Sequence, residues 1–195
     1  MIRFLIFIFS ICSITSNYFV LKSQINQSIL LLDAKNGDFS LPIKQLDDIN
    51  YKYPSLSLNT VPVLSYLSRY ETNNGRYYEA IKKLSKGLHY NPYNSYSKYL
   101  MSRNYIYLND FKNAETYLNQ IFEESPKIEV STTLYISVLD NNRNIKKLKE
   151  IFDELIKIDN KNVWIYYLTA LRNNVKTVDD KNLYTKSIAY FNKTF

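Results

Sequence analysis

The sequence predicts an all-α protein: a solenoid of helix-turn-helix units that follows a hydrophobic helix. Three observations support this fold class. Of the 195 residues 46% are hydrophobic, and only 3 are Gly and 5 are Pro, a composition that suits packed helices and argues against a disordered chain. A run of apolar residues opens the chain. Beyond it, apolar and turn residues recur with a period of 34 residues.

The opening run has two interpretations. Phe4–Ile14 has the length of the hydrophobic region of a signal peptide, although the best cleavage site, after Ser16, lacks a small residue at the −3 position. Alternatively, Phe4–Leu21 is a membrane anchor, since 18 helical residues span about 27 Å of a hydrocarbon core of about 30 Å. We predict residues 1–22 to be a signal anchor or transmembrane helix, with a cleaved signal peptide as the alternative.

Either interpretation exports the remainder of the chain. Arg3 precedes the apolar run and favours the cytoplasmic side for this end of the helix. We therefore expect a single-pass membrane protein with its repeats outside the cytoplasm, in a periplasmic or extracytoplasmic compartment. If the segment is cleaved, the protein is secreted.

The repeat is clearest in residues 61–94 and 95–128, which align with a shift of 34. Five landmarks coincide: Gly75 with Asn109, Tyr77 with Phe111, Ala80 with Ala114, Leu84 with Leu118 and Pro92 with Pro126. Each period is predicted to form a helix, a turn and a second amphipathic helix that ends before the proline, because proline cannot continue a helix.

The pattern extends in both directions. A further shift of 34 gives a copy at 129–162 and a partial copy at 163–174. A backward shift of 38 gives a copy at 23–56, with Gly37 and Pro54 as its landmarks and Ser57–Thr60 as additional loop residues. One helix pair cannot bury its own apolar face, whereas stacked pairs can, which is the physical reason for the repetition. Residues 175–195 are predicted to form a loop and a capping helix at Lys181–Phe191.

These landmarks resemble the tetratricopeptide repeat (TPR) family. The copy at 61–94 carries the residues typical of this repeat at Ser68, Gly75, Tyr77, Ala80, Leu84, Gly87 and Pro92, and the copy at 95–128 at Ser102, Tyr105, Asp110, Phe111, Ala114, Leu118 and Pro126. The flanking copies depart from the pattern, since Pro42 and Leu148 replace its alanine. The resemblance covers Ser23 to Asn174 and implies a right-handed TPR solenoid whose first helices line a concave groove.

The resemblance also implies a set of groove-facing residues: Arg69, Tyr96, Tyr99, Arg103, Ile106, Tyr107, Thr133, Ser137, Trp164 and Tyr167. Arg69 and Arg103 hold the same position in adjacent copies. Arginine binds carboxylates through two parallel hydrogen bonds, and tyrosine supplies rigid contact area. We therefore expect a protein or peptide partner that could be acidic. The alternative is that both arginines pair with neighbouring acids and that the tyrosines are merely abundant.

The remaining chemistry of the sequence is sparse. Cys12 and His89 are the only residues of their types, which argues against a metal site, a cofactor and a Ser-His-Asp or Cys-His catalytic pair. The basic clusters on the second helices do not alternate with stacking aromatics, so no nucleic acid is expected despite the net charge of +7.

The sequence thus predicts a non-enzymatic, membrane-anchored scaffold that binds a protein or peptide in its groove. By analogy, an accessory role in envelope glycan assembly is an alternative, because the arrangement resembles the TPR tails of O-antigen ligases and polymerases. A glycan-binding or enzymatic subunit is the third interpretation.

Overall fold

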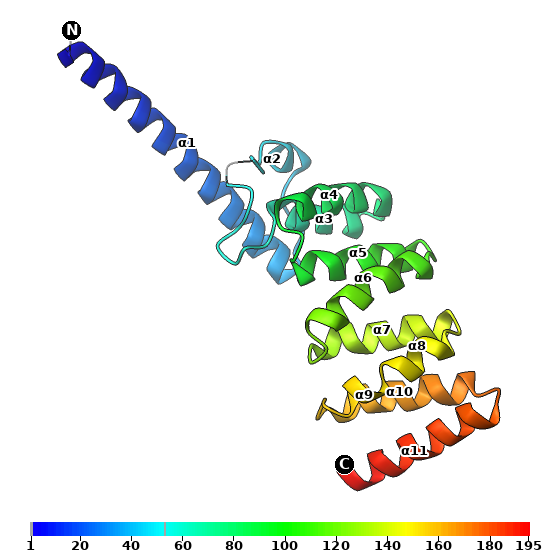
Figure 1. The fold of residues 1–195 in the computed structure, drawn as a ribbon. Coiled ribbons are helices and arrows are strands. Elements are labelled where there is room, and N and C mark those ends of the chain that lie inside the picture. Colours follow the sequence, from blue (N-terminus) through cyan, green and yellow to red (C-terminus); the bar gives the residue numbers. More distant parts are fainter. Residues whose placement is uncertain (1, 53) are drawn as a thin grey trace. The chain divides into compact units, whose positions relative to one another are not determined.

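The computed structural model describes residues 2–52 and 54–195, except for the side chains of residues 3 and 5 (Figure 1). The orientation predicted from the Arg3 side chain lies outside the described residues. The described residues form helices and no β-strand. Its helices are α1 (Ile2–Asn36), α2 (Ile43–Asp47), α3 (Val63–Asn73), α4 (Tyr77–Tyr90), α5 (Ser95–Tyr107), α6 (Phe111–Glu124), α7 (Glu129–Asn141), α8 (Ile145–Glu150), α9 (Phe152–Leu155), α10 (Lys161–Asn174) and α11 (Val178–Thr194).

The chain divides into two compact units, Met1–Leu100 and Met101–Phe195. In unit 1, α1 and α4 each contact α3. In unit 2, α7 contacts α6 and α10, and α10 in turn contacts α11. Each unit is therefore a stack of helices that share their apolar faces.

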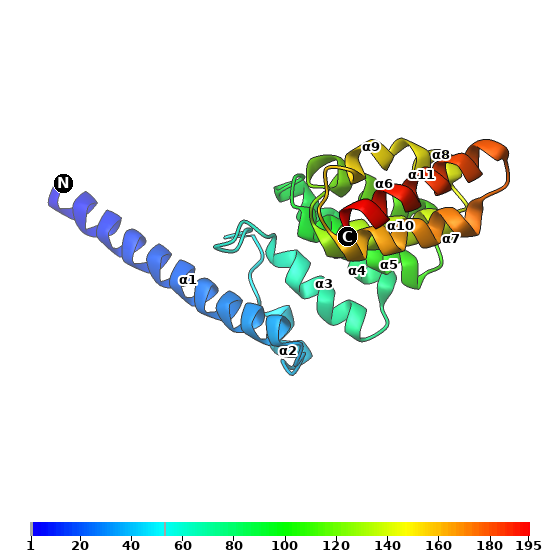
Figure 2. The ribbon, with the colours of Figure 1, turned by 90° about the horizontal axis from the view of Figure 1, so that it is seen from below.

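Helix α1 joins the apolar segment to the first repeat without a break. No glycine or proline interrupts residues 2–36, so nothing in the sequence ends the helix before Gly37, whose φ is +81°. Figure 2 shows the first part of α1 extending beyond the other helices of unit 1. The predicted hydrophobic helix and the predicted first helix of the copy at 23–56 are thus a single element.

The second half of α1 is anchored in unit 1. Leu30 and Ala34 are fully buried in a core shared with α3. The Gln27 Nε2 atom donates hydrogen bonds to the carbonyl oxygens of Asn50 at 2.7 Å and Pro54 at 2.9 Å. The Asp33 carboxylate accepts hydrogen bonds from Ser40 and from the Tyr70 hydroxyl. These contacts hold the helix, its following loop and α3 together.

The turns between paired helices share one backbone feature. Gly37, Gly75, Asn109 and Arg143 all have positive φ, and they recur at spacings of 38, 34 and 34 residues. A left-handed residue after a helix turns the chain back and costs glycine nothing, whereas it strains a residue with a Cβ atom. This requirement explains why glycine marks the position in two of the four copies.

The other landmarks of the repeat occupy defined places. Ala80 and Ala114 are fully buried, and Tyr77 and Phe111 begin α4 and α6. Gly87 packs against the start of α3, where a Cβ atom would lie 3.1 Å from Pro62 Cβ. Pro92 and Pro126 follow α4 and α6, and Pro54 lies in the loop bound by Gln27.

The two flanking copies, at 23–56 and 129–162, have shorter second helices. In the copy at 23–56, Pro42 precedes α2 as its N-cap, so the helix begins late and has only 5 residues. In the copy at 129–162, the second helix is divided at Ile151 into α8 and α9 and ends at Leu155. The expectation of two full helices in each period therefore holds only for the two central copies.

Candidate functional site

The two predicted groove arginines each contact an aromatic ring in their own unit. Arg69, in unit 1, places its guanidinium 5.2 Å from the centre of the Phe39 ring. Arg103, in unit 2, donates a hydrogen bond of 2.6 Å to the Tyr107 hydroxyl. Because the two arginines belong to different units, their shared groove stays a prediction.

Five other predicted groove residues are partly exposed. Tyr96, Tyr99, Ile106, Thr133 and Ser137 are all half-buried. The Thr133 and Ser137 hydroxyls donate to carbonyl oxygens one turn earlier in α7. The tyrosine and isoleucine side chains therefore keep part of their surface exposed.

Trp164 and Tyr167 are core residues, which corrects the expectation that they line the groove. Both are fully buried, and their ring centres lie 5.7 Å apart. The Tyr167 hydroxyl donates to the Leu148 carbonyl at 2.9 Å, and burial raises the pKa of this phenol. Helix α11 covers Trp164 with Tyr190, whose ring centre lies 4.8 Å away. The side chain of Trp164, at a repeat position where a groove residue was expected, is therefore covered by α11.

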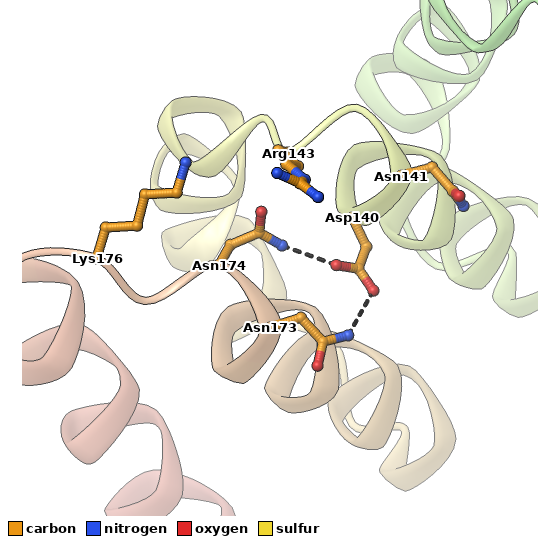
Figure 3. Close-up of a pocket in the computed structure, with 6 residues that line it drawn as sticks. All are labelled: Asp140, Asn141, Arg143, Asn173, Asn174 and Lys176. Carbon is orange, nitrogen blue, oxygen red and sulfur yellow. Dashed lines mark hydrogen bonds between the residues drawn. The ribbon is translucent and has the colours of Figure 1, made fainter.

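A polar cavity of about 360 Å³ lies in unit 2, where α7 and α10 end. It is lined by Asp140, Asn141, Arg143, Asn173, Asn174 and Lys176 (Figure 3). Asn173 and Asn174 point toward Asp140, whereas Asn141 points away. We call this cavity the turn pocket.

The only carboxylate of the turn pocket is held by two amides. Asn174 Nδ2 donates to Asp140 Oδ1 at 2.7 Å, and Asn173 Nδ2 donates to Asp140 Oδ2 at 2.8 Å. Amide donors orient a carboxylate without neutralising its charge. Neither Arg143 nor Lys176 has an ion-pair partner within the described part of the chain. With two cations and one acid, the turn pocket therefore carries a net charge of +1.

The same arrangement, in which two asparagine amides bind one carboxylate, recurs elsewhere in unit 2. Glu115 accepts hydrogen bonds from Asn142 at 2.6 Å and Asn144 at 2.8 Å. Glu129 accepts from Asn160 at 2.9 Å and Asn162 at 3.0 Å, and these two bonds hold the pKa of its carboxyl below the ordinary value. In each case two asparagines, 27 to 34 residues further along the chain, bind one carboxylate. The abundant asparagines thus connect consecutive helix pairs.

Arg143 occupies the turn position that favours glycine. Its φ is +52°, a conformation that costs a residue with a Cβ atom about 1 kcal/mol. A strained residue at a pocket is a reason to suspect a function for its side chain, since glycine would satisfy the backbone better. An arginine fork beside a lysine is suited to a carboxylate or a phosphate.

The described residues also answer the question of a metal site. Within residues 2–52 and 54–195, no group of three or more His, Cys, Asp or Glu side chains could hold a metal ion. Cys12 is exposed and unpaired with any other cysteine. The charged residues that line the turn pocket suit it to binding a charged group.

The sequence predicts a helix-turn-helix copy at 129–162 but not the pocket at its turn. One signal was available: Asn174 follows Asp140 by 34 residues, which is the repeat period, so the two lie at the same place in consecutive helix pairs. Polar residues separated by one repeat period are therefore a sequence signal for hydrogen bonds between consecutive helix pairs.

No protein-family model matches the chain, and no curated protein is similar to it in sequence. The comparison with solved structures, in contrast, finds several of MamA. One, described as "Crystal structure of MamA protein", has a TM-score of 0.62 at 18% identity over 88% of this chain and 89% of that chain. A second MamA crystal structure has a TM-score of 0.60 at 17% identity over 85% and 92% of the two chains. A third, of MamA AMB-1, has a TM-score of 0.61 at 15% identity over 89% and 91%. At these identities the likeness shows the fold, which supports a TPR-type arrangement of helices.

Proposed function

We propose that the chain is a membrane-anchored scaffold that binds an acidic segment of a protein partner and performs no chemistry itself. The course of α1 carries this proposal. Its first part is apolar and exposed, and its second part is packed into unit 1 through Gln27, Leu30 and Ala34. A helix with this division suits a membrane on one side and a folded repeat on the other.

The anchor is supported by length and composition. Among the described residues, the stretch Ile6–Asn36 of α1 is long and apolar enough to cross a membrane, a test that a signal sequence also passes. The two alternatives differ in what remains of the chain. An anchor keeps residues 1–16, whereas cleavage after Ser16 leaves a chain that starts in the middle of α1.

The anchor is tested by alkaline extraction of membranes, followed by mass measurement of the recovered chain. We expect the chain in the pellet with its first 16 residues present. A soluble chain that begins near Asn17 would contradict anchoring and support secretion.

Partner binding is supported by the net positive turn pocket and by the TPR-type fold. To test it, partners are captured from crosslinked membranes with the wild type and with the double variant Arg143→Glu/Lys176→Glu. We expect a specific partner to be lost from the variant. The control Lys161→Glu/Lys193→Glu introduces the same charge at two exposed positions in α10 and α11 and should keep the partner. Equal loss in both variants would mean that only net charge matters, and no loss in either would remove the turn pocket from the proposal.

The predicted groove is tested in the same way with Arg69→Glu/Arg103→Glu. Loss of the partner here and not with the turn-pocket variant would place binding at the TPR groove instead.

A further inference from the structure

Helix α1 has a second apolar face that its own unit does not cover. If Phe4 is taken as position a of a seven-residue repeat, positions a and d are occupied by Phe4, Phe7, Ile11, Ile14, Tyr18, Leu21, Ile25, Ser28 and Leu32. We call these nine residues the seam. Between Phe4 and Leu32, Ser28 is the only Ser, Thr, Asn, Gln or Lys at these positions. All the others lie at the remaining five positions, which in the first part of α1 also carry exposed apolar residues such as Ile6 and Phe9.

The seam continues beyond the predicted anchor, where α1 is already packed into unit 1. After Lys22, Ile25 is 52% exposed and Leu32 is 61% exposed, and their neighbour Ile29 is 40% exposed. On the opposite side of the same turns, Gln27, Leu30 and Ala34 are buried. Unit 1 therefore covers one face of this stretch and leaves the apolar face of the seam open.

Lipid alone does not account for this pattern. A helix that only contacts lipid needs no periodic separation of polar from apolar residues, and lipid contact gives no reason for the seam to continue past Lys22. A period of 3.5 residues instead keeps one stripe facing a second helix as the two wind around each other. The same packing geometry is common between transmembrane helices.

The chemistry of the seam favours an identical helix as the partner. A single-pass anchor fixes the direction of the helix, so two copies in one membrane are parallel and can align residue against residue. The seam from Phe4 to Leu32 contains no charged residue, so its juxtaposition with itself creates no like-charge contact. Ser10, Asn17 and Gln24 all fall at position g, on the border of the seam, where polar side chains can hydrogen-bond between helices.

We propose that α1 pairs in parallel along the seam with α1 of a second copy of the chain, within the membrane and for about three turns beyond it. This inference rests on the proposed membrane anchor. The two copies of unit 1 would lie on the outer sides of the helix pair, because the packed face of α1 is opposite the seam.

Cysteine crosslinking tests the seam, because a disulfide forms only between residues whose Cβ atoms approach each other closely. Cys12, the only cysteine, lies off the seam and is first replaced in a Cys12→Ser background. Single cysteines are then placed on the seam within the apolar segment (Ile11→Cys, Ile14→Cys) and beyond it (Ile25→Cys, Leu32→Cys). Phe9→Cys and Ser13→Cys, on the opposite face of the apolar segment, and Asn26→Cys beyond it are the controls.

Oxidation is carried out on the full chain in isolated membranes. We expect disulfide-linked dimers at the four seam positions, at least about fivefold more abundant than at the controls. If the chain resists extraction from the membrane but crosslinks equally at all positions, or at none, the paired seam is overturned and the anchor is not. Chain that is soluble and starts near Asn17 would overturn the anchor, and with it the parallel pairing.

Discussion

Arg143 combines an unfavourable backbone conformation with a pocket-lining side chain. The three other turns of this type use glycine or asparagine, which tolerate the left-handed region better. The arginine therefore lowers the stability of the turn. In return it places a positive charge in the turn pocket, which glycine could not do. This combination is testable, because stability and binding should respond in opposite directions.

We predict that Arg143→Gly stabilises the chain by about 1 kcal/mol and weakens capture of the acidic partner. Thermal unfolding in detergent measures the first effect, expected as a rise of about 2–4 °C in Tm, and crosslinked capture measures the second. Lys146→Gly, three residues further on and inside α8, is the matched control and should destabilise by about 1 kcal/mol. A lower Tm for Arg143→Gly would show that the turn is not strained.

The sequence predicts such turns better than it predicts pockets. Gly37, Gly75 and Asn109 identify left-handed positions because few residue types adopt that conformation, so the local sequence carries the information. The turn pocket depends on which amides reach Asp140 from another helix, and that is decided by the stacking of α7 on α10. Trp164 illustrates the same limit: its position in the repeat indicates a groove, but the packing of α11 determines that it is buried.

At the scale of elements, helices pack closely where the sequence provides a small residue. Gly87 allows α4 to approach α3, since a Cβ atom there would lie 3.1 Å from Pro62 Cβ and 3.5 Å from Leu64 Cβ. The first distance is tighter than an ordinary contact and the second is an ordinary contact, so a Cβ atom fits after a small displacement. Atoms beyond a Cβ atom would meet Pro62 and Leu64, which are both buried.

Gly87→Leu should therefore destabilise the chain by about 2–3 kcal/mol through overpacking. Gly87→Ala should change stability by less than about 1 kcal/mol, because the gain in helix propensity offsets the small displacement of Pro62. Chemical denaturation followed by circular dichroism measures both, and Ser85→Leu, exposed on the same helix, is the control. Similar stabilities for Gly87→Leu and Ser85→Leu would mean that α3 and α4 are not closely packed.

One acidic residue at the start of helix α11 connects the helix to α8. Asp180 forms a capping box with Thr177 and an ion pair with Lys149 at 2.6 Å. The ion pair and the backbone N–H groups of Lys176 and Thr177 hold the pKa of Asp180 well below its ordinary value. A carboxyl whose pKa is lower in the folded state stabilises that state fully above its unfolded pKa of about 3.9 and loses this contribution as the pH falls below it.

We therefore predict that Asp180→Asn lowers Tm at neutral pH, and that its difference from wild type shrinks as the pH falls from about 5 toward 2. Fluorescence of Trp164, the only tryptophan, reports the docking of α11 because Tyr190 packs against it. Asp179→Asn alters the adjacent, exposed carboxylate and should have little effect at any pH. A constant difference between Asp180→Asn and wild type across this range would show that the Asp180 charge does not hold α11.

At the scale of the whole molecule, the first part of α1 exposes a continuous run of apolar residues. Phe7 and Ile11 are exposed there, and in water they would form part of an unusually large apolar surface. The proposed anchor removes this surface from water.

We predict that Phe7→Arg/Ile11→Arg abolishes retention of the chain in alkali-washed membranes, since each arginine at the centre of a span costs about 3 kcal/mol. Ile43→Arg/Leu58→Arg changes two exposed apolar residues outside α1 and should leave retention unchanged. Retention of the first variant would show that another part of the chain binds the membrane.

The unbroken course of α1 also has a rotational consequence. Its 35 residues form a rod of about 52 Å in which each residue advances the direction of the side chains by about 100°. The angle between the face that enters unit 1 and the face at the other end is therefore set by the number of residues between them. Two residues inserted after Lys22 would rotate unit 1 relative to the apolar segment by roughly 200°, whereas seven would return it to within about 20° of its original orientation. The number of residues in α1 thus fixes the rotation of the first repeat about the helix axis relative to the apolar segment.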